Sequence, residues 1–315
     1  MPQHTDHEDY SQRTKLAVAA AAATGTTMGL DVSTPKVLYD AFSVVVHLAP
    51  SPVVARIPTI FPPWQEDVLE QTAAKQRAEL HVAAWLEQRG VPVVPPSQYL
   101  PPEPVQHDGF SMTFWELVEH DKSSEPDYVA GHGDTAGLHA HLDQYPGELD
   151  FLTPVAFIEP ALKHLETHAD LVDPADLDRA QKEWAILESY FGSRAAFNTK
   201  FPETPLQAIH GDAPSFNRIP TPASTLFADF EELTLGPVEW DLMLAGDEGV
   251  AAYNDAARER GIRQLDPMLL QGMEAVGRLR ALACLSLAPQ LPMLRDGLTG
   301  MIADWRERPI AAGLT

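Results

Sequence analysis

The chain has 315 residues, of which 44% are hydrophobic, and its 22 Lys and Arg against 45 Asp and Glu give a formal net charge of −23. This content allows one large domain or two modest ones with a sizeable core. An acidic surface repels phosphate backbones and anionic lipid headgroups, so the charge argues against nucleic-acid and membrane partners and favours cationic ligands. Solubility or a saline habitat would also account for it.

The N-terminal region predicts a helix of a cytoplasmic protein. Residues 17–23 are rich in alanine, but they lack the leucine-rich core of a signal peptide and are too short to span a bilayer. We therefore expect a helix over 11–24, preceded by a disordered HTDHEDY segment at 4–10 rather than a metal site. The single cysteine, Cys284, excludes an internal disulfide and fits a reducing compartment.

The next hundred residues predict a small mixed lobe. Residues 42–48 and 53–57 are rich in valine and are separated by a short proline turn, which predicts a hairpin. A stretch without Gly or Pro, 65–88, predicts a long helix, and 111–118 predicts a further strand. This order indicates an antiparallel sheet with helices.

The rest of the chain predicts mainly helices. Two short β-like pieces, 207–209 and 225–228, interrupt it, and each runs into a polar cluster. We expect a hairpin to bring the two clusters to one end of a small ribbon. The expected helices cover residues 134–143, 155–168, 174–193, 239–246, 248–260, 267–287 and 293–307.

The two polar clusters contain the side chains that phosphoryl transfer requires. Asp212 and Asn217 lie five residues apart, and Asp229 follows 12 residues later. A carboxylate and a carboxamide offer the oxygen ligands that Mg²⁺ prefers. A separate carboxylate is then available to accept a proton from a nucleophilic hydroxyl, which is the combination used in phosphoryl transfer.

The order His210-Gly211-Asp212, four spacers, Asn217 and then Asp229-Phe230-Glu231 follows the protein-kinase pattern. With Gly in the middle place, and with GPVEWDLM at 236–243, the chain resembles the aminoglycoside phosphotransferase family of small-molecule kinases. The resemblance implies an α+β, bilobal protein-kinase-like fold. A small N-terminal nucleotide-binding lobe with an antiparallel sheet would cover 1–118. A larger, mainly helical C-terminal lobe with the catalytic loop and acceptor site would cover 119–315.

The resemblance also implies roles for the three polar residues. Asp212 would orient and deprotonate the acceptor hydroxyl, while Asn217 and Asp229 would hold Mg²⁺ for ATP. We expect His210 to fix the loop by hydrogen bonding. Asp241 is expected either to cap a helix or to hold the catalytic loop by accepting hydrogen bonds from its backbone N–H groups.

For the first lobe, the resemblance implies nucleotide contacts. Arg56, in VVARIP, would bind the α- and β-phosphates and pair with Glu79. Ser43 stands where the family's nucleotide loop often has asparagine, and backbone groups near Glu116 and Val118 would bond adenine.

The acceptor would be a hydroxyl group of a small molecule such as an aminoglycoside, amino sugar or amino alcohol. Its contacts are expected in the helical region, at Asp247, Glu248, Tyr253, Asp255 and Arg278. The alternative is a catalytically inactive nucleotide-binding pseudokinase. A metallo-phosphoesterase is disfavoured because no further His and Asn ligands are suitably placed. The lack of a Walker A motif excludes a P-loop enzyme.

Overall fold

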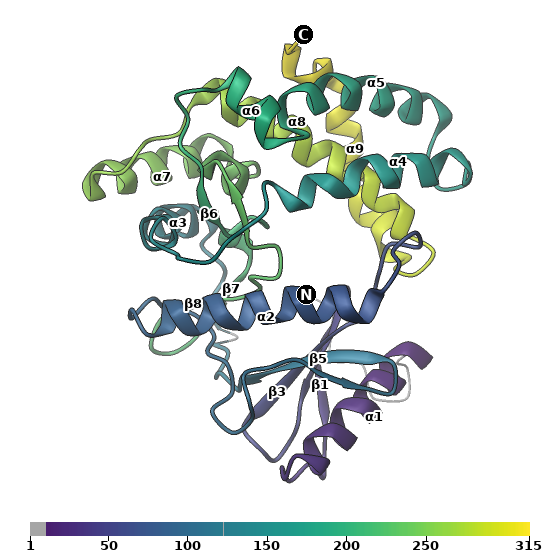
Figure 1. Ribbon diagram of the computed structural model, residues 1–315, viewed down its shortest axis with the longest axis vertical. Helices are drawn as coiled ribbons and strands as arrows, with labels where there is room; N and C mark the ends of the chain where they lie inside the picture. The colour runs from purple at the N-terminus through teal and green to yellow at the C-terminus, as the bar shows by residue number, and fades with distance from the viewer. Residues whose placement is uncertain (1–10, 122) are drawn as a thin grey trace. The chain divides into compact units, whose positions relative to one another are not determined.

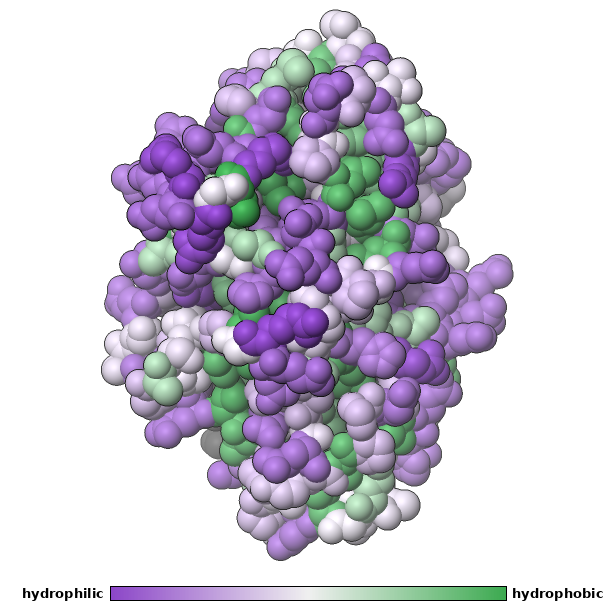
Figure 2. All heavy atoms as spheres, turned by 60° about the vertical axis from the view of Figure 1, so that its left-hand side comes forward, coloured by the Kyte–Doolittle hydropathy of each residue, from purple (hydrophilic) through white to green (hydrophobic). Residues whose placement is uncertain are grey.

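The computed structural model describes residues 11–121 and 123–315, so the expected disordered segment 4–10 lies outside the described residues. The chain divides into two compact units, Met1–His120 and Asp121–Thr315. Within the described part of the chain, no helix is long and apolar enough to cross a membrane. Hydrophilic side chains cover most of the face shown in Figure 2, with apolar ones between them in small groups, as expected from the acidic composition.

The first unit contains a five-stranded antiparallel sheet in the order β1-β2-β3-β5-β4. The strands are β1 Lys36–Asp40, β2 Ser43–His47, β3 Val53–Pro58, β4 Val105–His107 and β5 Phe110–Glu116. The predicted β2–β3 hairpin and the β5 strand are confirmed. The edge strands β1 and β4 were not predicted, because β1 alternates weakly and β4 has only three residues.

Two helices cover the two faces of this sheet (Figure 1). Helix α1, Gln12–Thr27, begins at Ser11, whose side chain accepts the Thr14 N–H. Its small buried residues, Ala17 among them, pack with alternate sheet residues such as Val44 and Phe114. Helix α2, Val68–Glu87, lies against the opposite face, so the side chains that alternate with the α1-facing ones point toward it.

The second unit is mainly helical and contains its own core. Its helices are α3 Tyr128–Leu142, α4 Ile158–Glu166, α5 Pro174–Phe191, α6 Arg194–Lys200, α7 Gly246–Arg260, α8 Pro267–Ala283 and α9 Met293–Glu307. Short 3₁₀ turns cover Thr153–Phe157, Pro214–Phe216, Val238–Leu242, Cys284–Leu287 and Ile310–Gly313. Helices α3 and α7 pack side by side (Figure 1). The core between the helices includes the buried rings of Trp240, Tyr253 and Trp305.

Several helix boundaries differ from the expected ones. Helix α3 begins at Tyr128 rather than 134, because the Asp127 carboxylate caps it by accepting the Ala130 N–H. The expected helix over 239–246 is wrong, since a short 3₁₀ turn occupies 238–242 and α7 begins at Gly246.

The β-like pieces 207–209 and 225–228 form strands of two different ribbons. Strand β6, Gln207–Ile209, pairs with β9, Thr234–Gly236, and β8, Thr225–Phe227, pairs with β7, Arg218–Pro220. The two missed strands are three residues long, and one ends in proline, so neither carries a strand pattern of its own. The hairpin that lies between Asn217 and Asp229 is therefore β7–β8, and β6 with β9 forms a second ribbon.

Candidate active site

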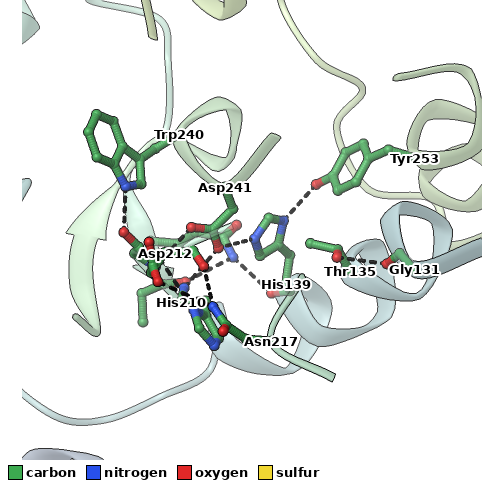
Figure 3. Close-up of polar contacts among 12 residues, drawn as sticks. Gly131, Thr135, His139, His210, Asp212, Asn217, Trp240, Asp241 and Tyr253 are labelled. Carbon is green, nitrogen blue, oxygen red and sulfur yellow. Dashed lines mark hydrogen bonds and ion pairs between the residues drawn. The ribbon is translucent and has the colours of Figure 1, made fainter. Parts of the chain in front are cut away.

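The loop after β6 carries the predicted catalytic residue, Asp212, and is held by hydrogen bonds to the carboxylate of Asp241. This carboxylate accepts hydrogen bonds from the backbone N–H groups of His210 and Gly211, both at 2.8 Å. The Trp240 indole N–H donates to the Gly211 carbonyl at 2.7 Å (Figure 3). Of the two roles expected for Asp241, the structure shows the second, that of holding the loop.

Asp241 is itself anchored in the interior by a histidine from α3. His139 Nε2 lies 2.9 Å from Asp241 Oδ2, and His139 Nδ1 lies 2.9 Å from the Tyr253 hydroxyl (Figure 3). Burial, and secondly the carboxylate of Glu239, raise the pKa of Tyr253, so its hydroxyl keeps its proton and donates to Nδ1. The single N–H of the neutral His139 ring is then on Nε2, which donates to Asp241. The carboxylate is fully buried and satisfied by three donors.

His210 fixes the other side of the loop. Its ring is fully buried, and Nε2 donates to the carbonyl of Ala228 at 2.9 Å. The ring also packs against Phe230, with ring centroids 4.7 Å apart. This bond ties the catalytic loop to the chain that leaves β8, so the predicted structural role of His210 is confirmed.

The β7–β8 ribbon brings the three predicted polar residues to one place. Asn217 precedes β7, and its carbonyl accepts the Ala228 N–H at 2.9 Å, which places Asp229 close to Asn217 at the same end of the ribbon. Asn217 Nδ2 donates to the Asp212 backbone carbonyl at 2.6 Å and lies 3.3 Å from its carboxylate. Asp229 adopts a left-handed backbone with φ 66°.

This donor set fits a hard divalent cation. Because the Asn217 amide nitrogen is committed to Asp212, its oxygen is the atom that remains to face a metal, and Asp229 adds a carboxylate. No group of three His, Cys, Asp or Glu suited to a metal occurs among residues 11–121 and 123–315. An ion bound here would therefore take its other ligands from water and phosphate, as Mg²⁺ commonly does.

A residue that the sequence did not single out lies beside Asp212. Arg280, on α8, places its guanidinium Nη1 3.7 Å from Asp212 Oδ1. It belongs to no motif, and only the folding of α8 against the catalytic loop reveals it. The acceptor contacts expected from the sequence stay predictions. Tyr253 is buried against His139, and Arg278 pairs with Glu274 and Asp304, while Asp247, Glu248 and Asp255 are exposed on α7.

In the first unit, Arg56 and Glu79 form the predicted pair. Arg56 Nη1 lies 3.2 Å from Glu79 Oε2, and the two side chains are only 11% and 1% exposed. An ion pair this buried joins β3 to α2 in a fixed geometry.

Ser43 lies in β2 with 5% of its surface exposed, so its side chain is not displayed on a loop. The β1–β2 connection is the short turn Ala41-Phe42, and Arg13 from α1 donates to the Ala41 carbonyl at 3.0 Å and pairs with Asp40. The turn is therefore held by the N-terminal helix.

The chain beyond β5 carries the predicted adenine contacts. Glu116 ends the strand, and its backbone N–H donates to the Pro95 carbonyl at 3.0 Å. The N–H of Leu117 donates to Pro52 at 3.1 Å. Val118 follows in irregular structure. Glu116 would thus contribute its carbonyl rather than its N–H to a ligand.

Solved structures with this fold are kinases of small molecules. A choline/ethanolamine kinase family protein from Mesorhizobium loti is 18% identical with a TM-score of 0.58, and the match covers 95% of this chain and 96% of that one. The GDP and kanamycin complex of APH(2")-IIia is 16% identical, with a TM-score of 0.57 and coverage of 91% and 96%. The microcompartment-associated aminopropanol kinase is 16% identical, with a TM-score of 0.58 and coverage of 94% and 98%. These similarities confirm the predicted protein-kinase-like α+β fold.

The fold is therefore one that small-molecule kinases share. No curated protein matches the chain. The model of the phosphotransferase enzyme family, APH, matches residues 45–280, so the chain belongs to this family. The predictions of an aminoglycoside phosphotransferase relative, and of an enzyme that transfers a phosphoryl group to an alcohol, are confirmed.

Proposed function

We propose that this protein is an ATP- and Mg²⁺-dependent kinase of a small hydroxyl compound, with Asp212 as the base-like residue. The observation that carries the proposal is the position of Asp212 on a loop held rigidly by Asp241, with Asn217 bonded to it and Asp229 next to Asn217 at the same end of the β7–β8 ribbon. Rigid positioning is what phosphoryl transfer needs most from a protein.

In this proposal each polar residue has a separate task. Asp212 accepts a hydrogen bond from the acceptor hydroxyl, orients it and takes its proton as the new bond to phosphorus forms. Asn217 and Asp229 hold the cation through oxygen atoms. Bound Mg²⁺ would bridge the phosphates and neutralise part of their charge. The hydrogen bond from the Asn217 amide to the Asp212 carbonyl fixes the position of Asp212 relative to these oxygens.

The first unit would bind the nucleotide. Arg56, held by Glu79, contacts the α- and β-phosphates, and the Glu116 carbonyl with the Val118 backbone bonds adenine. Since the Ser43 side chain is buried, we propose that this position acts through the neighbouring turn, whose backbone approaches the phosphates. The GDP complexes of APH(2")-IIia and aminoglycoside 2'-phosphotransferase-IIIa support nucleotide use.

The acceptor class is supported by the relatives and by charge. The structural relatives include a choline kinase from Streptococcus pneumoniae and a putative fructosamine-3-kinase from Haemophilus somnus, besides the kinases already described. A net charge of −23 favours cationic acceptors among these and disfavours nucleic acid and membranes as partners. We propose a cytoplasmic enzyme acting on an aminoglycoside, amino sugar or amino alcohol.

An acceptor-dependent release of ADP tests this function. Purified protein with ATP and Mg²⁺ is offered kanamycin, choline, ethanolamine, 1-amino-2-propanol and a fructosamine. We expect at least one to stimulate ADP release, and Asp212→Asn to abolish the stimulation while Mg-ATP still binds. The control is Asp178→Asn, which removes an exposed carboxylate on α5 paired with Lys182. Wild-type rates in Asp212→Asn would refute the assignment.

One observation favours a second candidate, a nucleotide-binding pseudokinase. The β1–β2 turn contains no glycine, and Phe42 in it is exposed, so the backbone there is less able to enclose phosphates than a glycine-rich loop. Mg-ATP binding without acceptor-dependent ADP release, for every compound offered, would favour this alternative.

A further inference from the structure

The guanidinium of Arg280 is a largely buried cation beside the catalytic loop. Its Nη1 lies 3.7 Å from Asp212 Oδ1, which is near enough for strong attraction but too long for a hydrogen bond. The Nε–H is buried and has no hydrogen-bond partner within the described residues. Since an unmade hydrogen bond on a buried charged group is costly, this donor is expected to have a partner at some stage of function.

The charged groups around Arg280 are acidic. Burial alone would lower the pKa of Arg280, but the carboxylates of Glu232, Asp212 and Glu231 outweigh it and raise that pKa, so the guanidinium stays charged. Cys284, one helical turn further, has a thiol whose pKa is raised by burial, so it adds no negative charge. Arg280 is therefore surrounded by carboxylates, of which Asp212 is the one proposed to change charge during the reaction.

Two kinds of anion could use the unsatisfied donor. The first is a permanent anionic group on the acceptor, but three carboxylates around the guanidinium would repel it. The second is the phosphoryl group itself. As the acceptor proton passes to Asp212, that carboxylate becomes neutral, and Arg280 loses a counter-charge 3.7 Å from its Nη1 just as negative oxygens arrive on the acceptor side.

We propose that Arg280 is a catalytic residue that contacts the phosphoryl group during its transfer, an inference that rests on the kinase function proposed above. The acceptor oxygen forms a bond to the γ-phosphorus, the bond from this phosphorus to the oxygen of ADP breaks, and the acceptor proton moves to Asp212. Arg280 balances the charge of Asp212 before the transfer and binds the phosphoryl oxygens as that charge is lost. An arginine in this role stabilises the transferred group in other phosphoryl-transfer enzymes.

Steady-state kinetics of Arg280→Gln test the role. The probe is whichever of kanamycin, choline, ethanolamine, 1-amino-2-propanol or fructosamine the wild type phosphorylates fastest. We expect kcat to fall by roughly 10²–10³, with the KM of the acceptor nearly unchanged, because the contact exists only during transfer. Arg280→Lys keeps the charge without the planar fork and should lose less. The control is Arg295→Gln on α9, which removes an arginine paired with Asp170 at the surface.

Two further measurements separate catalysis from a structural role. Guanidinium ion at millimolar concentration should restore part of the kcat of Arg280→Ala, which a purely structural defect would not allow. Calorimetry should show that Arg280→Gln binds Mg-ADP normally but loses the added affinity that aluminium fluoride, a mimic of the phosphoryl group, gives to the wild type.

Clear outcomes overturn the inference. It is wrong if Arg280→Gln keeps more than about a third of the wild-type kcat, or if only the acceptor KM rises, since either result removes the transition-state contact. If Arg280→Gln fails to fold, Arg280→Lys and the guanidinium test on Arg280→Ala decide in its place. A wild type that transfers phosphate to none of the acceptors counts against the proposed function instead, whereas a working wild type unaffected by Arg280→Gln counts against this inference alone.

Discussion

Gly211 and the backbone of Glu232 approach each other so closely that a Cβ built on Gly211 would lie 1.9 Å from the Glu232 carbonyl oxygen. The φ of Gly211 is +89°, a conformation that other residues rarely adopt. The glycine before the proposed catalytic aspartate is therefore required by both backbone conformation and space. Its two neighbours, His210 and Asp212, depend on this turn for their positions.

We predict that Gly211→Ala removes activity by displacing the catalytic loop. The added methyl group meets backbone, which cannot move aside as a flexible side chain could, so the cost should exceed the about 1–2 kcal/mol of left-handed strain alone. The matched control is Gly261→Ala, at φ +69° with open space around its Cβ position, which carries only the strain. Urea denaturation and ADP release should separate the two variants. Equal losses of stability and activity in the two variants would show that the close contact at Gly211 is unimportant.

The buried contact between Asp241 and the catalytic loop gives a second prediction. Asp241→Ala leaves the N–H groups of His210 and Gly211, and the His139 ring, without their acceptor. Each unsatisfied buried donor costs about 1–3 kcal/mol, so the free energy of unfolding should fall by several kcal/mol and kcat should collapse. Tyr253→Phe removes only the outer bond to His139 and should cost about 1 kcal/mol with kcat largely kept. Comparable loss of kcat in both variants would contradict this order of importance.

The order of elements in the first unit followed from local sequence patterns, because β2, β3, α2 and β5 each carry a periodicity of their own. What the sequence did not reveal was pairing at a distance. Strand β6 pairs with β9 and not with β8, although β8 is closer to it in the sequence. Three-residue strands have too few side chains to specify a partner, so tertiary packing selects it.

The candidate site likewise combines residues with a local sequence pattern and residues that only the fold brings together. Asp212, Asn217 and Asp229 are predicted from motif spacing alone, and the loop and the β7–β8 ribbon bring these three residues together. Arg280 was not recognisable, since it lies 68 residues after Asp212 with no local pattern and reaches the site only through the packing of α8. Ser43 also shows what motif position alone does not reveal, since its side chain is buried in strand β2.

The pair formed by Arg56 and Glu79 gives a third prediction, for nucleotide binding. Glu79→Ala leaves a largely buried guanidinium without this partner, a change that typically costs about 3–5 kcal/mol. We expect the Kd for Mg-ATP to rise at least about tenfold in Arg56→Gln, because a charge-assisted phosphate contact is lost. The control is Arg77→Gln on α2, the helix that carries Glu79. Arg77 lies 3.4 Å from its partner Glu103, and both side chains are about half exposed. An unchanged Kd in Arg56→Gln would exclude Arg56 from the phosphate site.

The last prediction concerns pH and His132, a histidine of α3 that is only 2% exposed. Its Nε2 lies 3.4 Å from the Ser215 hydroxyl, and its Nδ1 has no hydrogen-bond partner in residues 11–121 and 123–315. Burial, and secondly the positive charge of Arg218, lower the pKa of His132. The native state therefore binds fewer protons at this site than the unfolded chain between the lowered pKa and about 6.5.

Stability from His132 should thus be fully present above about pH 6.5 and be lost as the pH falls from there through the lowered pKa. His132→Gln removes the titrating group, so the difference in free energy of unfolding, wild type minus variant, should grow from about pH 5.5 to 7.5. Urea denaturation across this range measures it, with His141→Gln, an exposed position on the same helix, as the control for removing an imidazole. Parallel stability curves for wild type and His132→Gln would show that the pKa of His132 is the same in the folded and the unfolded chain, and would contradict the effect of burial.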